Sequence, residues 1–270
     1  MAKKYIYEPK GRAREYAPLA LNVYRGCPHA CDYCYVRRGL GVKDTTPHYR
    51  LDMDVVRREA EALRGDPRPV LLSFYSDPYP RGFDAVETGE AIRVLLEHDV
   101  RVRVLSKGGM HPGLVRDMAV LADHADRVEY GTTLSLWDDT RRAVVEPGAA
   151  CAAERIQALS YARKMGLRTW ASLEPIVDPA ETAACLDHAH DVLDMVKIGW
   201  INYAKHPAPD GLPDVIEAAL GHGLEVGLKH DAAKVLARLG REDLVPRCVQ
   251  LWVQPEASAP LETDRQMSLV

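Results

Sequence analysis

Three features are missing from this 270-residue sequence, and each absence excludes a class of protein. No apolar run approaches the roughly 20 residues that a membrane span needs, so we expect no membrane partner. The net charge is −4, so no overall basic field points to nucleic acid, although a local basic groove stays open. No secretory signal opens the chain. Together with six cysteines, this predicts a cytoplasmic protein whose thiols stay reduced and available for metal.

Among the residues present, three clustered cysteines are the most informative. Cys27, Cys31 and Cys34 have the spacing C-x3-C-x2-C and supply three thiolates within one loop. Three protein ligands do not close a four-coordinate site. The spacing therefore predicts a compact metal centre with one position left for a ligand that is not protein.

Structural zinc is the main alternative for this loop, because His29 offers a fourth ligand. Zinc sites usually draw their ligands as two separated pairs, and no second C-x2-C or H-x3-H pair occurs in the chain. His29 also lies only two residues from both Cys27 and Cys31, which is tight for one tetrahedron. A disulfide would leave one of the three thiols unpaired. An iron–sulfur cluster fits the spacing and the thiolate ligands best.

Short apolar runs alternate with amphipathic stretches along most of the chain, which predicts βαβ units and a parallel sheet. We expect strands over residues 19–24, 69–75, 100–105, 127–136, 167–173 and 195–201. We expect helices over residues 51–64, 86–98, 111–122, 151–165, 179–192 and 231–239, with a further pair of elements at 213–220 and 224–228. Six or so units are too few for a closed eight-stranded barrel. The predicted fold class is therefore α/β, a partial (β/α)6 barrel.

The domain organisation follows from the same pattern. Residues 1–17 are basic and polar and are expected to form an N-terminal arm ahead of the core. Residues 18–270 are expected to form a single partial-barrel domain, in which the tail after Trp252 is a C-terminal extension. No internal repeat or interdomain linker is evident.

Polar residues, glycine and proline follow each expected strand, where α/β barrels gather their functional groups. These strand ends are the cysteine loop, Ser73-Phe-Tyr-Ser-Asp-Pro-Tyr79, Ser106-Lys-Gly-Gly109, the run with Thr132, Thr133 and Ser135, Leu173-Glu-Pro175, and Trp200-Ile-Asn-Tyr203. We expect them to line one open mouth.

The cysteine motif, with the aromatic Tyr33 directly before Cys34, resembles the cluster loop of the radical S-adenosylmethionine (SAM) superfamily. A narrower resemblance to the spore photoproduct lyase-related branch, the SplB-like enzymes, is carried by several further motifs in order. These are Ser76-Asp-Pro-Tyr79, Ser106-Lys107, Glu146-Pro-Gly148 with Arg155, and Leu173-Glu-Pro-Ile176.

The resemblance implies two cofactors, a [4Fe–4S] cluster and SAM. It makes Cys27, Cys31 and Cys34 the cluster ligands. Around SAM it implies Tyr33 beside the cluster, Ser76 and Asp77 near the methionyl group, Lys107 on the carboxylate, and Ser135 and Glu174 facing the ribose and amino groups. An ammonium group on a strand end suits a carboxylate. Lys107 could instead be a solvated loop lysine, and Asp77 before Pro78 could simply cap a turn.

The implied reaction is reductive cleavage of SAM to a 5′-deoxyadenosyl radical that abstracts hydrogen from a substrate. It requires an electron donor such as flavodoxin or ferredoxin. Tyr35 is a candidate relay for a hydrogen atom, although packing beside the cluster is an equal alternative. Glu146 and Arg155 are expected to form a structural ion pair or loop anchor.

One departure puts the photoproduct reaction itself in doubt. Photoproduct lyases carry a hydrogen-donating cysteine at the end of the second strand, where this chain has Phe74 and Tyr75. Cys151, at the start of an expected helix, is the best substitute thiol, because a helix N-terminus can lower a thiol pKa.

The substrate stays open between nucleic acid, as the branch implies, and a peptide, an RNA or a small metabolite. A non-catalytic metal-binding module is the alternative from another class. Four arginines could serve a nucleic-acid substrate, although their spacing suits surface charge equally well: Arg37, Arg38, Arg141 and Arg142.

Overall fold

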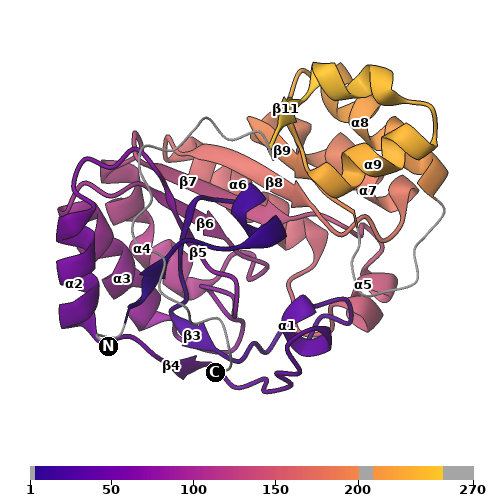
Figure 1. Ribbon diagram of the computed structural model, residues 1–270. Helices are drawn as coiled ribbons and strands as arrows, with labels where there is room; N and C mark the ends of the chain where they lie inside the picture. Colours follow the sequence, from indigo (N-terminus) through magenta and orange to yellow (C-terminus); the bar gives the residue numbers. More distant parts are fainter. Residues whose placement is uncertain (1–3, 201–208, 252–270) are drawn as a thin grey trace.

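The computed structural model describes residues 4–200 and 209–251, which form a nine-stranded sheet with helices packed against it (Figure 1). The strand order is β1-β2-β5-β6-β7-β8-β9-β10-β11. The strands are β1 (Ile6–Tyr7), β2 (Leu19–Leu21), β5 (Val70–Leu72), β6 (Val102–Leu105), β7 (Val128–Thr133), β8 (Arg168–Leu173), β9 (Met195–Ile198), β10 (Glu225–Leu228) and β11 (Val249–Gln250). Within the described residues no pairing joins the two edges, so the barrel is partial and open.

Within this nine-stranded sheet, all neighbouring strands from β2 to β11 run parallel, and β1 alone pairs antiparallel, with β2. This confirms the predicted α/β class and the six-strand core. Two parallel strands, β10 and β11, extend the sheet beyond that core. The longer helices are α2 (Met53–Ala62), α3 (Val86–Glu97), α4 (Pro112–Asp123), α6 (Ala152–Lys164), α7 (Pro179–Ala189), α8 (Leu212–Gly221) and α9 (His230–Arg238).

Local sequence signals account for the helix boundaries. Asp52 and Asp178 accept hydrogen bonds from backbone N–H groups in the first turns of α2 and α7, as N-cap residues do. Gly166 has a positive φ of 87° two residues after α6, which ends within one residue of the predicted range 151–165.

The first strand is shorter than residues 19–24, because Asn22 turns its side chain to another strand end. Its Oδ1 accepts hydrogen bonds from the N–H groups of Phe74 and Tyr75, at 2.8 and 2.9 Å. Beyond it, β3 (Tyr24–Arg25) pairs with β4 (His48–Tyr49) in a separate small sheet. The cysteine loop lies between these two strands and leads into α1 (Tyr35–Arg38). Neither the small sheet nor α1 was predicted.

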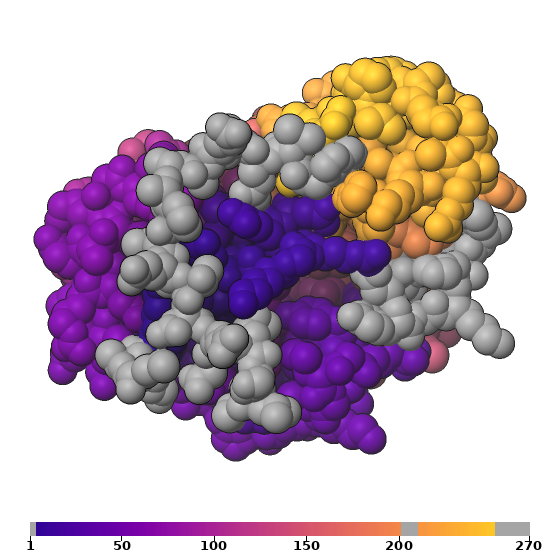
Figure 2. Space-filling view, viewed as in Figure 1, coloured from indigo at the N-terminus to yellow at the C-terminus, as the bar shows by residue number. Residues whose placement is uncertain are grey.

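The N-terminal segment lies across the concave face of the large sheet, where it appears in indigo in Figures 1 and 2. It contributes β1 and a 3-10 helix, Gly11–Glu15, and the carbonyl of Tyr16 accepts hydrogen bonds from Arg103 and Lys197 on two sheet strands. A second apolar cluster forms here around Trp170 and Met195. The division into an arm and a single domain stays a prediction, but this segment packs tightly against the sheet.

Two sequence predictions fall on residues outside those described: the end of the sixth strand at residues 201–203, and the extension after residue 252. In the described part of the chain, no helix combines the length and the apolarity that a bilayer span would require.

Candidate active site

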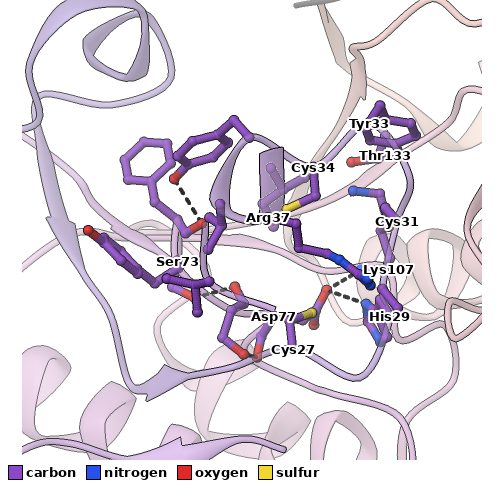
Figure 3. Close-up of a pocket in the computed structure, with 18 of the residues that line it drawn as sticks. Cys27, His29, Cys31, Tyr33, Cys34, Arg37, Ser73, Asp77, Lys107 and Thr133 are labelled. Atoms are coloured by element: carbon purple, nitrogen blue, oxygen red, sulfur yellow. Dashed lines mark hydrogen bonds and ion pairs between the residues drawn. The ribbon is translucent and has the colours of Figure 1, made fainter. Parts of the chain in front are cut away.

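One cavity of about 220 Å³ opens at the carboxyl ends of the strands. Cys27, Cys31 and Cys34 all line it, together with Lys107 and Asp77 (Figure 3). Further along the sheet, past the ends of β8 and β9, it is lined by Glu174 and Trp200, together with Tyr16 from the N-terminal segment. The fold therefore brings most of the predicted site residues to a single cavity.

The cysteine loop is held by its backbone on both sides. Gly26 has a positive φ of 87°, and a Cβ there would lie 2.1 Å from the Thr46 carbonyl oxygen, so the approach to Cys27 requires glycine. On the other side, Asp32 N donates to Val145 O at 2.8 Å and Gly148 N donates to His29 O at 3.0 Å. The Glu146-Pro-Gly148 motif thus supports the cysteine loop from a distant part of the sequence.

Burial dominates the chemistry of the free thiols. It raises the pKa of Cys27 to about 11 and that of Cys31 to about 12. Iron–sulfur clusters are bound by thiolates, so loading a metal centre here would release protons.

His29 is not available as a fourth ligand in this arrangement. Its Nδ1 lies 3.4 Å from the carboxylate of Asp77, and its Nε2 accepts a hydrogen bond from Arg81 N at 3.3 Å. Both ring nitrogens are thus engaged by the protein. Nor do three His, Cys, Asp or Glu side chains converge on a single-ion site anywhere in residues 4–200 and 209–251.

Asp77 ties its own strand-end loop to the loop after β6 and, through His29, to the cysteine loop. Its carboxylate accepts hydrogen bonds from Ser106 Oγ (2.6 Å), Lys107 N (2.7 Å) and Tyr79 N (2.9 Å). Burial alone would raise its pKa, but His29 and these donors lower it to about 2. The hydroxyl of Ser76 donates to Gly26 O at 2.5 Å, just ahead of Cys27. Both side chains line the cavity, but these contacts favour an anchoring role over direct contact with SAM.

A buried ion pair stands behind the loop. Glu146 and Arg155 are 0% and 2% exposed, and Arg155 Nη2 is bonded to Glu146 Oε2, which confirms the predicted structural pair. The hydroxyl of Tyr33 donates to the other carboxylate oxygen of Glu146. Tyr33 thus links the loop to this pair.

Lys107 holds its ammonium group 5.5 Å from the centre of the Tyr33 ring. Burial would lower its pKa, but the neighbouring Cys31 and Glu146 outweigh this and raise it, so the cation is retained. No hydrogen bond from its Nζ is made within the described ranges. Lys107 is therefore a charged donor facing the cavity.

The far end of the cavity is assembled from three distant segments. Glu174, directly after β8, accepts hydrogen bonds through Oε2 from Tyr16 OH (2.5 Å) and from Lys229 Nζ (2.6 Å). Tyr16 comes from the N-terminal segment and Lys229 directly follows β10. Neither is a predicted site residue, and nothing in the local sequence of Tyr16 points to the sheet interior.

Of the three remaining predicted site residues, one lines the cavity and two do not. Tyr35 lines the cavity, and its hydroxyl donates to Phe74 O at 2.9 Å. Ser135 is fully buried, and neither it nor Cys151, the N-cap residue of α6, is among the cavity-lining residues. The structure thus does not bring Ser135 or Cys151 to the site.

Comparison with known proteins agrees with this geometry. The family model of the radical SAM superfamily matches residues 21–193, more than half of the sequence, and the chain belongs to this superfamily. Membership implies an enzyme that uses a [4Fe–4S] cluster and SAM.

Similar curated proteins carry no assigned function. An uncharacterized protein of Mycobacterium tuberculosis is 30% identical over 170 residues, covering 58% of this chain and 49% of the relative. One of Methanocaldococcus jannaschii is 23% identical over 188 residues, covering 65% and 66%. The chain thus spans about half the length of the mycobacterial relative.

Solved structures share the fold at low identity. SuiB of Streptococcus suis, bound to the precursor peptide SuiA, aligns with a TM-score of 0.59 at 12% identity, over 84% of this chain and 53% of SuiB. Methylornithine synthase aligns at 0.56 and 15%, over 93% and 76%. Spore photoproduct lyase with a dinucleoside spore photoproduct aligns at 0.54 and 16%, over 89% and 63%. These likenesses establish the partial-barrel fold.

Proposed function

We propose that Cys27, Cys31 and Cys34 bind the [4Fe–4S] cluster and that SAM occupies the same cavity. The observation that carries this assignment is the convergence of all three cysteines and Lys107 on one cavity at the strand ends. The donor set fits the cluster, because clusters are held by thiolates and His29 is already engaged. When bound, the cluster and SAM together supply a 5′-deoxyadenosyl radical for hydrogen abstraction, after one electron arrives from a flavodoxin- or ferredoxin-type donor.

The residues of the chain would bind and orient SAM. Lys107 offers an ammonium group for the carboxylate of SAM, at the cysteine end of the cavity. Asp77 and Ser76 hold the strand-end loops and the start of the cysteine loop in register. Phe74 and Trp200 give the cavity apolar walls, which exclude water and competing hydrogen donors.

We further propose that the enzyme belongs to the spore photoproduct lyase-related branch but ends its reaction differently. Among the described residues, the cysteines lining the cavity are the three proposed cluster ligands. A thiol at the position of Phe74 or Tyr75 is missing, and Cys151 does not line the cavity. The tyrosines of the cavity, Tyr35 among them, are therefore the proposed source of any hydrogen atom returned to the product.

Nucleic acid is the substrate class that the branch implies, but the arginine pairing gives it little support. Arg38 pairs with Asp32, Arg141 with Asp178 and Glu181, and Arg142 with Asp139. Of the four arginines considered, Arg37 is the one that lines the cavity. DNA affinity measured against salt concentration decides this point. A steep loss of affinity with salt supports a nucleic-acid substrate, and a flat profile favours a peptide or small metabolite.

The decisive experiment is anaerobic reconstitution with iron and sulfide, followed by addition of reductant and SAM. We expect the wild-type protein to bind iron and sulfide and to release 5′-deoxyadenosine, and Cys31→Ala to do neither. Cys185→Ala is the matched control, because Cys185 is equally buried but lies on α7 outside the cavity lining. A loop that binds zinc and refuses a cluster would refute the proposal.

A further inference from the structure

We propose that Tyr16 and Lys229 are positioning residues, which hold Glu174 as the carboxylate acceptor for the ribose hydroxyl groups of SAM. The inference rests on the proposed function, since it takes SAM as the ligand of the cavity. It assigns part of the binding site to the N-terminal segment, which the sequence pattern places outside the core.

One carboxylate oxygen of Glu174 is fixed by two donors. Tyr16 OH donates to Oε2 at 2.5 Å, and Lys229 Nζ donates to the same oxygen at 2.6 Å. Tyr16 OH is also 2.8 Å from Ser172 Oγ, which orients the phenol. Lys229 is 2% exposed, so its ammonium group has exchanged water for these contacts, and charge-assisted hydrogen bonds of this kind are strong.

The other oxygen of Glu174 remains available. Glu174 lines the cavity, and no donor within the described residues hydrogen-bonds to its Oε1. A carboxylate has acceptor capacity on both oxygens. With Oε2 anchored from behind, the carboxylate keeps one orientation and offers Oε1 to a ligand that carries O–H or N–H donors.

The polarity of the cavity matches the polarity of SAM. Lys107 places a cation beyond the end of β6, and Glu174 places an acceptor beyond the end of β8, two strands further along the sheet. SAM carries its carboxylate at one end and its ribose hydroxyls toward the other. An acidic side chain on ribose hydroxyls is the same solution that dinucleotide-binding folds use.

Gly199, directly after β9, is required for this arrangement. A Cβ at this position would lie 2.7 Å from Glu174 Cδ and 2.8 Å from Lys229 Cδ, closer than side-chain atoms pack. The glycine is needed for space, since its φ lies outside the left-handed region. The two side chains meet in the gap that its missing Cβ leaves.

The N-terminal segment is tied to the same residues a second time. Glu15 Oε1 accepts a hydrogen bond from His230 N at 3.0 Å, and Glu15 Oε2 lies 3.7 Å from Lys229 Nζ. Lys229 thus stands between two carboxylates that are 159 positions apart in the sequence. Removing its charge would leave Glu15 and Glu174 facing each other, so the orientation of Glu174 depends on this lysine.

The test measures SAM affinity of the full-length reconstituted protein by calorimetry, with cluster content checked in every variant. We expect Tyr16→Phe to weaken SAM binding about tenfold, the size of one charge-assisted hydrogen bond. Lys229→Met should weaken it by about tenfold to a hundredfold, and Lys229→Arg should restore most of the loss. Gly199→Ala, which changes no charge, should weaken binding in the same direction.

Two fragments of SAM separate positioning from general damage. 5′-Deoxyadenosine carries the ribose without the carboxylate, so its affinity should fall in Tyr16→Phe and Lys229→Met but not in Lys107→Met. Methionine carries the carboxylate without the ribose and should show the reverse pattern. Equal losses for both fragments in every variant would overturn the inference.

Tyr130→Phe is the matched control for Tyr16→Phe. Tyr130 on β7 is fully buried, its hydroxyl makes no hydrogen bond among the described residues, and it does not line the cavity. We expect SAM affinity within about threefold of wild type in this variant. If Tyr130→Phe weakened SAM binding as much as Tyr16→Phe does, or if Tyr16→Phe and Lys229→Met both bound SAM normally, the inference would be wrong. A wild-type protein that holds a cluster but binds no SAM would instead refute the proposed function.

Discussion

The two ends of the cavity are built in opposite ways. At one end, three cysteines within eight residues of sequence provide the metal ligands. At the other, Tyr16, Glu174 and Lys229 come from the N-terminal segment, the end of β8 and the end of β10. The cysteine end has a sequence signature because its three ligands are near neighbours in the chain. The Glu174 end has no sequence signature, because a hydrogen-bond donor from any part of the chain can fix the carboxylate.

The contrast is less complete than the motif suggests, because the cysteine loop also depends on distant residues. It is held by Val145, Gly148 and the buried pair of Glu146 and Arg155 through Tyr33. A local motif thus supplies the ligands, while non-local contacts supply their geometry. Variants at the ligands and variants at the supporting residues separate these two contributions.

Replacing one ligand should break the cysteine end alone. Cys31→Ala should abolish bound iron and reduce 5′-deoxyadenosine formation by more than about a hundredfold, since cluster chemistry needs all three thiolates. In the iron-free protein, urea unfolding should change by no more than about 2 kcal/mol, as for removal of a small buried side chain. Retained iron in this variant would contradict the assignment.

Removing Glu146 should damage the support of the loop without touching a ligand. Glu146→Ala leaves Arg155 as an uncompensated buried charge, and we expect unfolding free energy to fall by about 3–5 kcal/mol. The double variant Glu146→Leu with Arg155→Met should recover part of this loss, although the carbonyls of Thr133 and Ala150 lose their donor. Urea denaturation of the three proteins measures both effects. A double variant less stable than Glu146→Ala would speak against charge burial as the cause.

Gly148→Ala should act on the same support through space alone. A Cβ at Gly148 would lie 2.1 Å from the Pro28 carbonyl oxygen, so the cysteine loop must shift. We expect a loss of about 1–3 kcal/mol in the unfolding free energy, together with reduced iron content despite three intact cysteines. Gly221→Ala is the control, because a Cβ there meets no atom within 4 Å. Normal iron loading in Gly148→Ala would show that the loop tolerates the shift.

The smallest effect should come from acid, on the concave face beneath Tyr16. Burial would raise the pKa of Glu129, but the Arg103 guanidinium, 2.6 Å away, outweighs this and lowers it. A carboxyl whose pKa is lowered by folding stabilises the protein above its unfolded pKa of about 4.3, and this stability is lost as pH falls below that value. Unfolding free energy measured from pH 6 to pH 3 should therefore decline more steeply in wild type than in Glu129→Gln. Equal slopes in the two proteins would contradict the assignment of this pH dependence to Glu129.

The parts of this site that sequence could predict are those with a periodic or local signal. Strand positions such as 100–105 and 167–173 were correct within two residues, because buried parallel strands are short apolar runs between helices. The convergence of Lys107 and Glu174 on one cavity followed from the common edge of parallel strands.

The parts that could not be predicted depend on pairings between distant segments. Ser135 lies just after β7, as other predicted site residues lie just after their strands, yet it is fully buried outside the cavity. The alternation of strands and helices in the sequence does not tell how far a residue lies past the end of its strand. Tyr16 sits in a basic, polar segment that resembles an arm. Its place on the sheet depends on Arg103 and Lys197, which are isolated charged residues in their own strands.

The docking of the N-terminal segment also sets an order of events during synthesis. The bond between His230 N and Glu15 joins residues 215 positions apart, whereas the three cysteines emerge from the ribosome almost together. The barrel interior cannot close over Tyr16 until translation has passed Lys229, and closing so long a loop is slow. A nascent chain therefore exposes its three thiols well before the residues that form the opposite wall of the cavity have been synthesised.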